Sequence, residues 1–303
     1  MKRSIQITEF RLPAIPAIVE LMKPITWFPP MWAFGCGVVS AGVGLEGRWP
    51  FVVVGALLTG PLVCATSQIV NDWYDRDVDA INEPNRPIPS GRVPGEWGFI
   101  LAVCWTAVSL VVAALLGMAV LGAAIIGLIL AWAYSAPPAR LKKNGWWGNS
   151  AVAICYEGLP WITGATVMAG ALPGWKGLVI PLLYSFGAHG IMTLNDFKSI
   201  EGDKRSGVAS LPVQLGADRA ALVACAMMAA PQIVVAGLLF AWDRPLHAAA
   251  IALSLLVQLY LMTRLVRKPR ELAPWYNATG VSLYVTGMLI AGLALRHLNG
   301  GAL

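Results

Sequence analysis

The sequence predicts an all-α, polytopic membrane protein that folds as one bundle. Hydrophobic residues make up 57% of the 303 residues and charged residues only 13%, against roughly 25% charged in typical soluble domains. The mean hydropathy is +0.65. A chain of this length suits a single membrane domain over residues 1–303, with residues 1–20 as a short cytoplasmic arm.

Nine apolar segments predict a bundle of nine transmembrane helices. They lie near 25–45, 51–70, 98–116, 118–136, 150–170, 177–195, 219–241, 246–263 and 278–296. The third and fourth need a separate argument, because residues 97–139 contain no charged side chain. A single helix over that range would run roughly 64 Å, about twice the hydrocarbon core. We therefore expect two helices joined by a tight turn near Gly117.

Basic residues predict the orientation of this bundle. With the N-terminus in the cytoplasm, 18 of the 22 Lys and Arg residues fall in the arm or in loops on the cytoplasmic side. Cytoplasmic loops carry such an excess in membrane proteins. The four that fall outside are Arg48, Lys176, Arg244 and Arg296. Polar residues interrupt the basic N-terminus too early for a signal peptide.

An acidic motif, NDWYDRDVDAINEPNRPIPSG at residues 71–91, ends the second apolar segment. At about 100° per residue, one helical face carries Asn71, Asp72, Asp75 and Asp79. Asp77 points away from that face. Carboxylates at membrane depth are costly and tend to be functional, so this face is a candidate metal site.

A second acidic motif, NDFKSIEGDKRSG, begins at Asn195 and also ends an apolar segment. On a continuous helix, the equivalent face carries Asn195, Asp196, Ser199 and Asp203. A solvated acidic helix end would have no reason to repeat in the same phase, so we expect the two motifs to face one site.

The ligands that these motifs offer are all oxygen atoms, which select a hard cation such as Mg²⁺. Basic residues accompany each motif and the loop YSAPPARLKKNGWWGN at 134–149. We expect four of them to bind phosphate oxygens, and these are Arg86, Arg140, Lys142 and Lys204. Carboxylates mixed with bases predict a metal–diphosphate site.

A diphosphate at the boundary between an apolar bundle and the cytosol points to an isoprenoid diphosphate. Metal and cations would stabilise the departing pyrophosphate while the allylic C1–O bond ionises. The expected catalytic residues are Asp75, Asp79, Asp203, Lys142 and Tyr134. Tyr134, or else Trp147, would offer a π face to the carbocation.

The two acidic motifs in a nine-helix bundle resemble the UbiA superfamily of membrane prenyltransferases. Within it, both acidic motifs, the 134–149 loop and the following SLPVQLG are similar to the chlorophyll synthases, while YEGLPWITGA (156–165) and HGIMTLNDF (189–197) resemble their bacteriochlorophyll branch. The similarity runs from about Glu20 to the last helix. The first metal motif of the superfamily corresponds to Asn71, Asp75 and Asp79.

One departure from the superfamily pattern concerns the second metal motif, which usually has two Asp residues four apart. Here these positions are Ser199 and Asp203. The resemblance leaves open whether Asp196 or Glu201 supplies the missing carboxylate, although a helix would turn Glu201 away.

The resemblance implies Mg²⁺-dependent transfer of a geranylgeranyl or phytyl group from its diphosphate to the 17-propionate of a bacteriochlorophyllide. It also implies a multi-pass protein of the inner or intracytoplasmic membrane, with the active site facing the cytoplasm and in contact with lipid. Other pigment-biosynthesis or photosynthetic assembly proteins are expected neighbours, and no nucleic-acid partner is expected. A propionate has a pKa near 4.3, so no enzymic base is required.

Two alternatives stay open at this point. The chain could be another enzyme of the superfamily, with a chlorophyllide, an aromatic ring or a haem vinyl group as acceptor. It could also be a pigment carrier or a divalent-cation transporter without enzymatic activity. The five cysteines lie singly in apolar segments and show no metal-ligand spacing. His189 is expected to be a hydrogen-bonded bundle residue.

Overall fold

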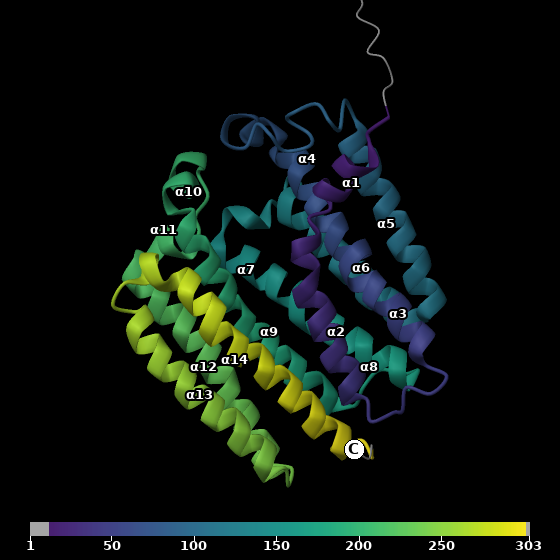
Figure 1. Cartoon of the computed structure of the whole chain (residues 1–303), viewed down its shortest axis with the longest axis vertical. Coiled ribbons are helices and arrows are strands. Elements are labelled where there is room, and N and C mark those ends of the chain that lie inside the picture. Colours follow the sequence, from purple (N-terminus) through teal and green to yellow (C-terminus); the bar gives the residue numbers. More distant parts are fainter. Residues whose placement is uncertain (1–11, 301–303) are drawn as a thin grey trace, which may run out of the picture.

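The computed structural model describes residues 12–300, and within them the chain is built from helices (Figure 1). The N-terminal half comprises α1 (Ile15–Leu21), α2 (Phe28–Ser40), α3 (Trp49–Leu57), α4 (Ala65–Asn82), α5 (Trp97–Leu116), α6 (Met118–Ser135), α7 (Gly145–Ala153) and α8 (Leu159–Ala169). The C-terminal half comprises α9 (Trp175–Asn195), α10 (Ile200–Ser206), α11 (Leu211–Leu215), α12 (Ala217–Ala241), α13 (Pro245–Leu265) and α14 (Pro269–Leu298).

Seven helices of the described part are long and apolar enough to cross a membrane. They are Trp49–Asn82, Trp97–Leu116, Met118–Ser135, Trp175–Lys198, Ala217–Ala241, Pro245–Leu265 and Pro269–Leu298. Two further expected spans coincide with α2 and with the run α7–α8, which do not meet the same criterion of length and hydropathy. The all-helical class is confirmed, and the count of nine spans stays a prediction.

The turn predicted near Gly117 is confirmed. Helix α5 ends at Leu116 and α6 begins at Met118, with Gly117 between them at φ 126°. This is a backbone conformation that residues with a Cβ rarely adopt. One glycine is therefore enough to reverse the chain between two apolar helices.

Two interruptions of α-helical geometry lie inside the bundle. A π-helical segment, Leu58–Cys64, joins α3 to α4 and contains Pro61. A second, Ile154–Gly158, joins α7 to α8. Single π-helical turns inside longer helices are frequent at functional sites. Both segments contribute side chains to an internal cavity that is described below.

Close helix contacts rely on glycine, as in many membrane bundles. A Cβ on Gly37 of α2 would lie 2.0 Å from the Trp161 carbonyl oxygen, and one on Gly164 of α8 would lie 2.2 Å from the Phe34 oxygen. Helices α2 and α8 therefore approach backbone to backbone. Gly190 plays the same part between α9 and α12, because its Cβ would lie 2.4 Å from the Ala224 oxygen.

The two acidic motifs lie at one end of the bundle. The end of α4, the α10–α11 segment and α1 are together at the top of Figure 1, whereas α14 carries the C-terminus to the opposite end. The buried core of the C-terminal half is formed mainly by α9, α12, α13 and α14, and includes Tyr184, Tyr276 and Tyr284. The helices thus hold both motifs, which are far apart in sequence, at the same depth.

Candidate active site

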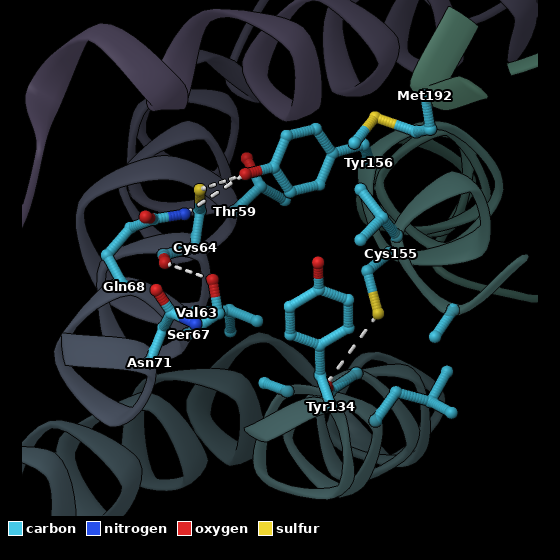
Figure 2. Close-up of a pocket in the computed structure, with 15 residues that line it drawn as sticks. Thr59, Val63, Cys64, Ser67, Gln68, Asn71, Tyr134, Cys155, Tyr156 and Met192 are labelled. Atoms are coloured by element: carbon cyan, nitrogen blue, oxygen red, sulfur yellow. Dashed lines mark hydrogen bonds between the residues drawn. The ribbon is translucent and has the colours of Figure 1, made fainter. Parts of the chain in front are cut away.

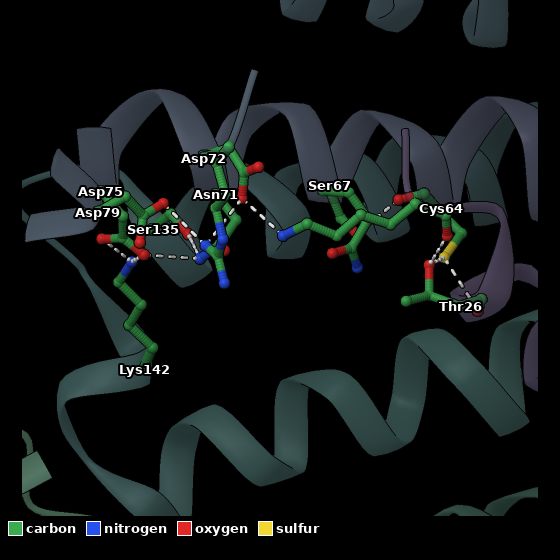
Figure 3. Close-up of polar contacts among 12 residues, drawn as sticks. Thr26, Cys64, Ser67, Asn71, Asp72, Asp75, Asp79, Ser135 and Lys142 are labelled. Carbon is green, nitrogen blue, oxygen red and sulfur yellow. Dashed lines mark hydrogen bonds and ion pairs between the residues drawn. The ribbon is translucent and has the colours of Figure 1, made fainter. Parts of the chain in front are cut away.

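The first acidic motif is helical throughout, since α4 extends to Asn82. Asn71, Asp75 and Asp79 line one polar chamber, as their shared face predicts. The Asn71 amide donates hydrogen bonds of 3.1 Å to Asp75 Oδ2 and to Ser135 Oγ on α6. Figure 3 shows these side chains along α4. The amide of Asn71 is thereby oriented with its nitrogen toward Asp75.

Two aspartates of the first motif, Asp72 and Asp77, lie outside the chamber lining. Asp77 is exposed, as its angle on the helix predicts. Asp72 is only 1% exposed and pairs with Lys23 at 2.6 Å. We expected Asp72 on the metal-binding face, and its place beside Lys23 corrects that expectation. The Lys23 ammonium, two residues after the end of α1, donates a hydrogen bond to Asp72 Oδ1 and holds this carboxylate away from the chamber lining.

The second acidic motif is not a continuous helix, which corrects the geometry predicted from the sequence. Helix α9 ends at Asn195, a 3₁₀ turn covers Asp196–Lys198, and α10 begins at Ile200. Asp196, Ser199 and Asp203 nevertheless all line the polar chamber. The turn changes the angle between neighbouring residues but keeps these three oxygen-bearing side chains on one side.

Asn195 is the residue that the broken helix displaces. Its Oδ1 accepts a 2.8 Å hydrogen bond from Asn277 of α14, and it does not line the chamber. The expectation that Asn195 matches Asn71 as a metal ligand is therefore not supported by its position. Its amide instead joins the end of α9 to α14.

Neutral donors hold the carboxylates of the second motif. Asp203 Oδ2 accepts hydrogen bonds from Ser199 Oγ at 3.1 Å and from Ser210 Oγ at 2.7 Å. Asp196 Oδ2 accepts one of 3.1 Å from the Asn149 amide. Within residues 12–300, neither carboxylate has an ion-pair partner within 4.0 Å. A cation entering the chamber would find uncompensated charge here.

Glu201, the alternative to Asp196, is exposed and faces away from the chamber. Its Oε1 lies 3.9 Å from Lys204 Nζ and 3.7 Å from Arg270 Nη1. Lys204 is likewise exposed and lies outside the chamber lining. The expectation that Lys204 binds diphosphate is thus not supported by its position, since its nearest charged partner is Glu201.

The first motif, in contrast, is matched by basic residues. Lys142 forms an ion pair with Asp75, and Arg140 Nη2 lies 3.8 Å from the same carboxylate. Arg86 Nη1 lies 2.8 Å from Asp79 and 3.5 Å from Asp72. Three of the four expected phosphate-binding bases therefore pair with carboxylates of the first acidic motif. Arg140 and Lys142 also line the chamber, whereas Arg86 does not.

Burial acts on these bases in different ways. It lowers the pKa of the Lys142 ammonium below its usual value, although neighbouring Asp75 acts in the opposite direction. At Arg86 burial also acts to lower the pKa, but Asp72 and Asp79 outweigh it and hold the guanidinium pKa above its usual value. Arg86 therefore remains cationic, and Lys142 is the easier of the two to deprotonate.

The polar chamber has a volume of about 380 Å³ and adjoins an internal cavity of about 220 Å³. Asn71 and Tyr134 line both. Figure 2 shows the Tyr134 ring pointing into the internal cavity. Opposite lies Tyr156, whose hydroxyl accepts a 3.2 Å hydrogen bond from Gln68. The rest of the internal cavity is lined by the two π-helical segments and by α4, α6, α7 and α9, largely through apolar atoms.

Sequence reasoning missed several residues that shape this site. Lys23 was counted only for topology, yet it neutralises Asp72. Asn149, Ser210 and Gln68 are uncharged. The available signals were the place of Gln68 in an apolar segment and the places of Asn149 and Ser210 at the ends of two motifs that carry the family resemblance. Asn149 and Gln68 act through hydrogen bonds to residues 44 or more positions away in the sequence. Ser210 acts through the turn after α10, which brings it to Asp203.

The histidines lie away from the reacting groups. His189 Nε2 lies 3.3 Å from the Trp146 carbonyl oxygen, and the two rings are 5.6 Å apart. This confirms His189 as a hydrogen-bonded bundle residue. His247 and His297 pack ring against ring at 5.4 Å, beside Arg244. None of the three lines the polar chamber.

The donor set of the chamber fits Mg²⁺. Its candidate ligands are carboxylate and amide oxygens, namely those of Asn71, Asp75, Asp79, Asp196 and Asp203. Among residues 12–300, no three His, Cys, Asp or Glu side chains are gathered closely enough to enclose an ion by themselves. Mg²⁺ usually takes one or two protein carboxylates and completes its coordination with water and substrate phosphates.

Residues 27–293 match the UbiA prenyltransferase family, so the chain belongs to this family of enzymes that transfer prenyl groups. The bacteriochlorophyll synthase 33 kDa chain of Cereibacter sphaeroides is 54% identical over 288 residues, which cover 95% of each chain. The bacteriochlorophyll synthase 34 kDa chain of Chloroflexus aurantiacus is 46% identical and covers 91% of this chain and 89% of that one. The similarity to the bacteriochlorophyll branch is thereby confirmed.

A solved structure agrees with the fold. A UbiA homologue from Archaeoglobus fulgidus, bound to GPP and Mg²⁺, has a TM-score of 0.70 to this chain at 19% identity. The match covers 93% of this chain and 99% of that one. At this identity the comparison shows the UbiA-type fold alone.

Proposed function

We propose that this protein transfers a geranylgeranyl or phytyl group from its diphosphate to the 17-propionate of a bacteriochlorophyllide. One observation carries the proposal: a polar chamber lined by two acidic motifs and a basic loop adjoins a largely apolar cavity, and Tyr134 and Asn71 line both. The chamber offers charged groups for a diphosphate, and the cavity beside it offers a mostly apolar lining for the first part of the isoprenoid chain. The 54% identity to a protein named bacteriochlorophyll synthase supports this acceptor.

Mg²⁺ would be held by Asn71, Asp75 and Asp79 on one side and by Asp196 and Asp203 on the other, and when bound it would neutralise the leaving pyrophosphate. Their positions around one chamber support this assignment. Asp72 and Asn195 are assigned supporting roles, because one binds Lys23 and the other Asn277.

Lys142, Arg140 and Arg86 are assigned to the diphosphate. Each is now paired with a carboxylate of the first motif, and each would turn toward phosphate oxygens when those carboxylates bind a cation. Lys142 is the least exposed of the three at its side chain, 14% against 30% and 33%. Its charge is therefore the least screened by solvent, and its loss should slow departure of the diphosphate the most.

The remaining chemistry needs few groups from the protein. Tyr134 lies where the chamber meets the cavity, so its ring can face the allylic carbon as the C1–O bond breaks. The apolar walls exclude water from the carbocation. The attacking propionate is ionised above about pH 4.3, so its oxygen can form the new ester bond without a base.

We also propose that the acidic end of the bundle faces the cytoplasm, in the inner or intracytoplasmic membrane. The excess of basic residues in the arm and in the loops at that end supports this orientation. Reaction of the N-terminal and C-terminal ends with a membrane-impermeant reagent in sealed vesicles would test it, since the two ends should lie on opposite sides.

The test of function uses purified protein with Mg²⁺ and geranylgeranyl diphosphate. Bacteriochlorophyllide, chlorophyllide and an aromatic acceptor are offered separately, and chromatography identifies the product. The proposal expects an ester of bacteriochlorophyllide and one pyrophosphate per ester. Product from another acceptor alone would indicate a different prenyltransferase, and pigment or metal binding without pyrophosphate release would indicate a carrier.

A further inference from the structure

Asp72 is a buried carboxylate that has two cations beside it. Its side chain is 1% exposed, and its Oδ2 has no hydrogen-bond partner among residues 12–300. The other oxygen, Oδ1, lies 2.6 Å from Lys23 Nζ and 3.5 Å from Arg86 Nη1. Burying a charge is costly unless an opposite charge lies next to it. Asp72 therefore needs at least one of these two cations as its partner.

Arg86 is shared between this buried carboxylate and the polar chamber. Its Nη1 donates a 2.8 Å hydrogen bond to Asp79 Oδ2, and Asp79 lines the chamber. The same nitrogen is 3.5 Å from Asp72 Oδ1, which is beyond the usual range of about 2.7–3.2 Å. Asp72 and Asp79 thus compete for one guanidinium group, and Asp79 has the shorter contact.

The backbone of Lys23 is fixed on both sides in a strained conformation. Lys23 has φ 47° and ψ 69°, in the left-handed region that residues with a Cβ rarely adopt. Its N–H donates to the Glu20 carbonyl oxygen at 3.1 Å, and its own carbonyl oxygen accepts hydrogen bonds of 2.9 Å from both Thr26 N and Thr26 Oγ1. Strained residues persist where surrounding contacts fix them, and they cluster at functional sites. Lys23 therefore meets Asp72 from a fixed position.

We propose that Lys23 is a positioning residue of the diphosphate site, which neutralises Asp72 and so leaves Arg86 beside Asp79. Without Lys23, Arg86 would be the one cation within 4.0 Å of Asp72 among residues 12–300, and its guanidinium would move from Asp79 toward Asp72. With Lys23 in place, Arg86 is available to phosphate oxygens once Asp79 binds a cation. Lys23 itself does not line the chamber.

This inference rests on the proposed function, because it concerns the diphosphate of the prenyl donor. It predicts that loss of Lys23 weakens donor binding, and that removal of the Asp72 charge in the same chain restores it. A lysine that served only to dock α1 would give a different pattern, since removing its partner as well would not repair the lost contact.

The experiment measures the dissociation constant of geranylgeranyl diphosphate by calorimetry, on the full chain with Mg²⁺ and no acceptor. Lys23→Met is expected to raise this constant about tenfold, because Arg86 no longer reaches the phosphate oxygens. The double variant Lys23→Met/Asp72→Asn should return to within about threefold of wild type, which is the coupling that a double-mutant cycle detects. Thermal melting shows whether each variant is folded.

Two control variants separate charge from docking. Lys268→Met is the matched control, since Lys268 pairs with Glu271 at 3.1 Å but the two side chains are 64% and 68% exposed, and donor affinity should stay that of wild type. Glu20→Gln removes the ion pair between α1 and Arg92. This pair is also exposed, so its loss should change the affinity less than about threefold. A Glu20→Gln defect equal to that of Lys23→Met would overturn the proposal, because docking of α1 would then be what matters.

Unchanged donor affinity in Lys23→Met would also overturn the proposal, as would a double variant that binds as weakly as the single one. Asp72→Asn alone should bind the donor at least as tightly as wild type, and this variant decides the question if Lys23→Met does not fold. Weaker binding by Asp72→Asn would overturn the proposal, because Asp72 would then act on the site directly. Failure of the proposed function is a different result, since wild-type protein would then bind no prenyl diphosphate with Mg²⁺.

Discussion

Replacement of Asn149 by alanine tests whether the second acidic motif holds metal. The Asn149 amide donates to Asp196 Oδ2 at 3.1 Å and to Thr193 Oγ1 at 3.3 Å. Asn149 is only 5% exposed and Thr193 is fully buried, so water cannot easily replace the lost donor. A hydrogen bond to a charged group contributes about 1.5–3 kcal/mol. At about 1.4 kcal/mol per factor of ten, its loss corresponds to roughly 10- to 100-fold.

The assay is the Mg²⁺ dependence of pyrophosphate release at a saturating prenyl diphosphate. Asn149→Ala is expected to raise the Mg²⁺ concentration for half-maximal rate by about 10- to 100-fold, in line with other residues that orient a metal ligand. Thr193→Val is the matched variant, because it keeps the bond between Asn149 and Asp196 and should shift the midpoint less than about threefold. Thermal melting shows whether each variant is folded. A folded Asn149→Ala protein with the wild-type Mg²⁺ requirement would refute the assignment of Asp196.

Three other predictions concern the second motif, the helix contacts and the acceptor. Ser199→Asp should keep activity within a few fold of wild type at saturating Mg²⁺. Without Mg²⁺ the variant should melt at a lower temperature than wild type, because Ser199 Oγ lies 3.1 Å from Asp203 and two carboxylates would repel there. A loss of activity above tenfold at saturating Mg²⁺ would contradict this prediction. Gly164→Ala should lower the free energy of unfolding by about 1–3 kcal/mol, since its Cβ would lie 2.2 Å from a carbonyl oxygen. Gly35→Ala is the control, since nothing lies within 4 Å of a Cβ at residue 35, and this variant should be at least as stable as wild type. Equal melting temperatures of Gly164→Ala and Gly35→Ala would count against the close packing of α2 and α8. His189→Gln should leave the single-turnover rate within a few fold and add no pH dependence above about pH 6, and a collapse of that rate in folded protein would reveal a missing base.

The fold was largely accessible from the sequence because hydrophobic segments in lipid have few alternatives to the helix. The uncharged stretch 97–139 is too long for one membrane-spanning helix, so it had to contain a break. The structure has that break at Gly117. The geometry of the first acidic motif was also predictable, since α4 continues as a regular helix to Asn82 and keeps the 100° spacing.

The second motif was predicted less well, and the reason is local. The 3₁₀ turn at Asp196–Lys198 breaks the helical register that the argument required. Asn195 therefore faces Asn277 and leaves the site. Likewise, Lys23 and Asn149 act through contacts with distant segments, and no spacing within one segment indicates such contacts.

The most direct measurement of the central claim, that chemistry takes place in the chamber lined by the acidic motifs, compares two aspartates of one helix. Asp75 lines the chamber and pairs with Lys142, whereas Asp77 is exposed. Esterified bacteriochlorophyllide is quantified for Asp75→Ala and Asp77→Ala after both are shown to insert and fold. We expect no detectable ester from Asp75→Ala and a rate within a few fold of wild type from Asp77→Ala. Equal loss in both variants, or full activity in Asp75→Ala, would contradict the account.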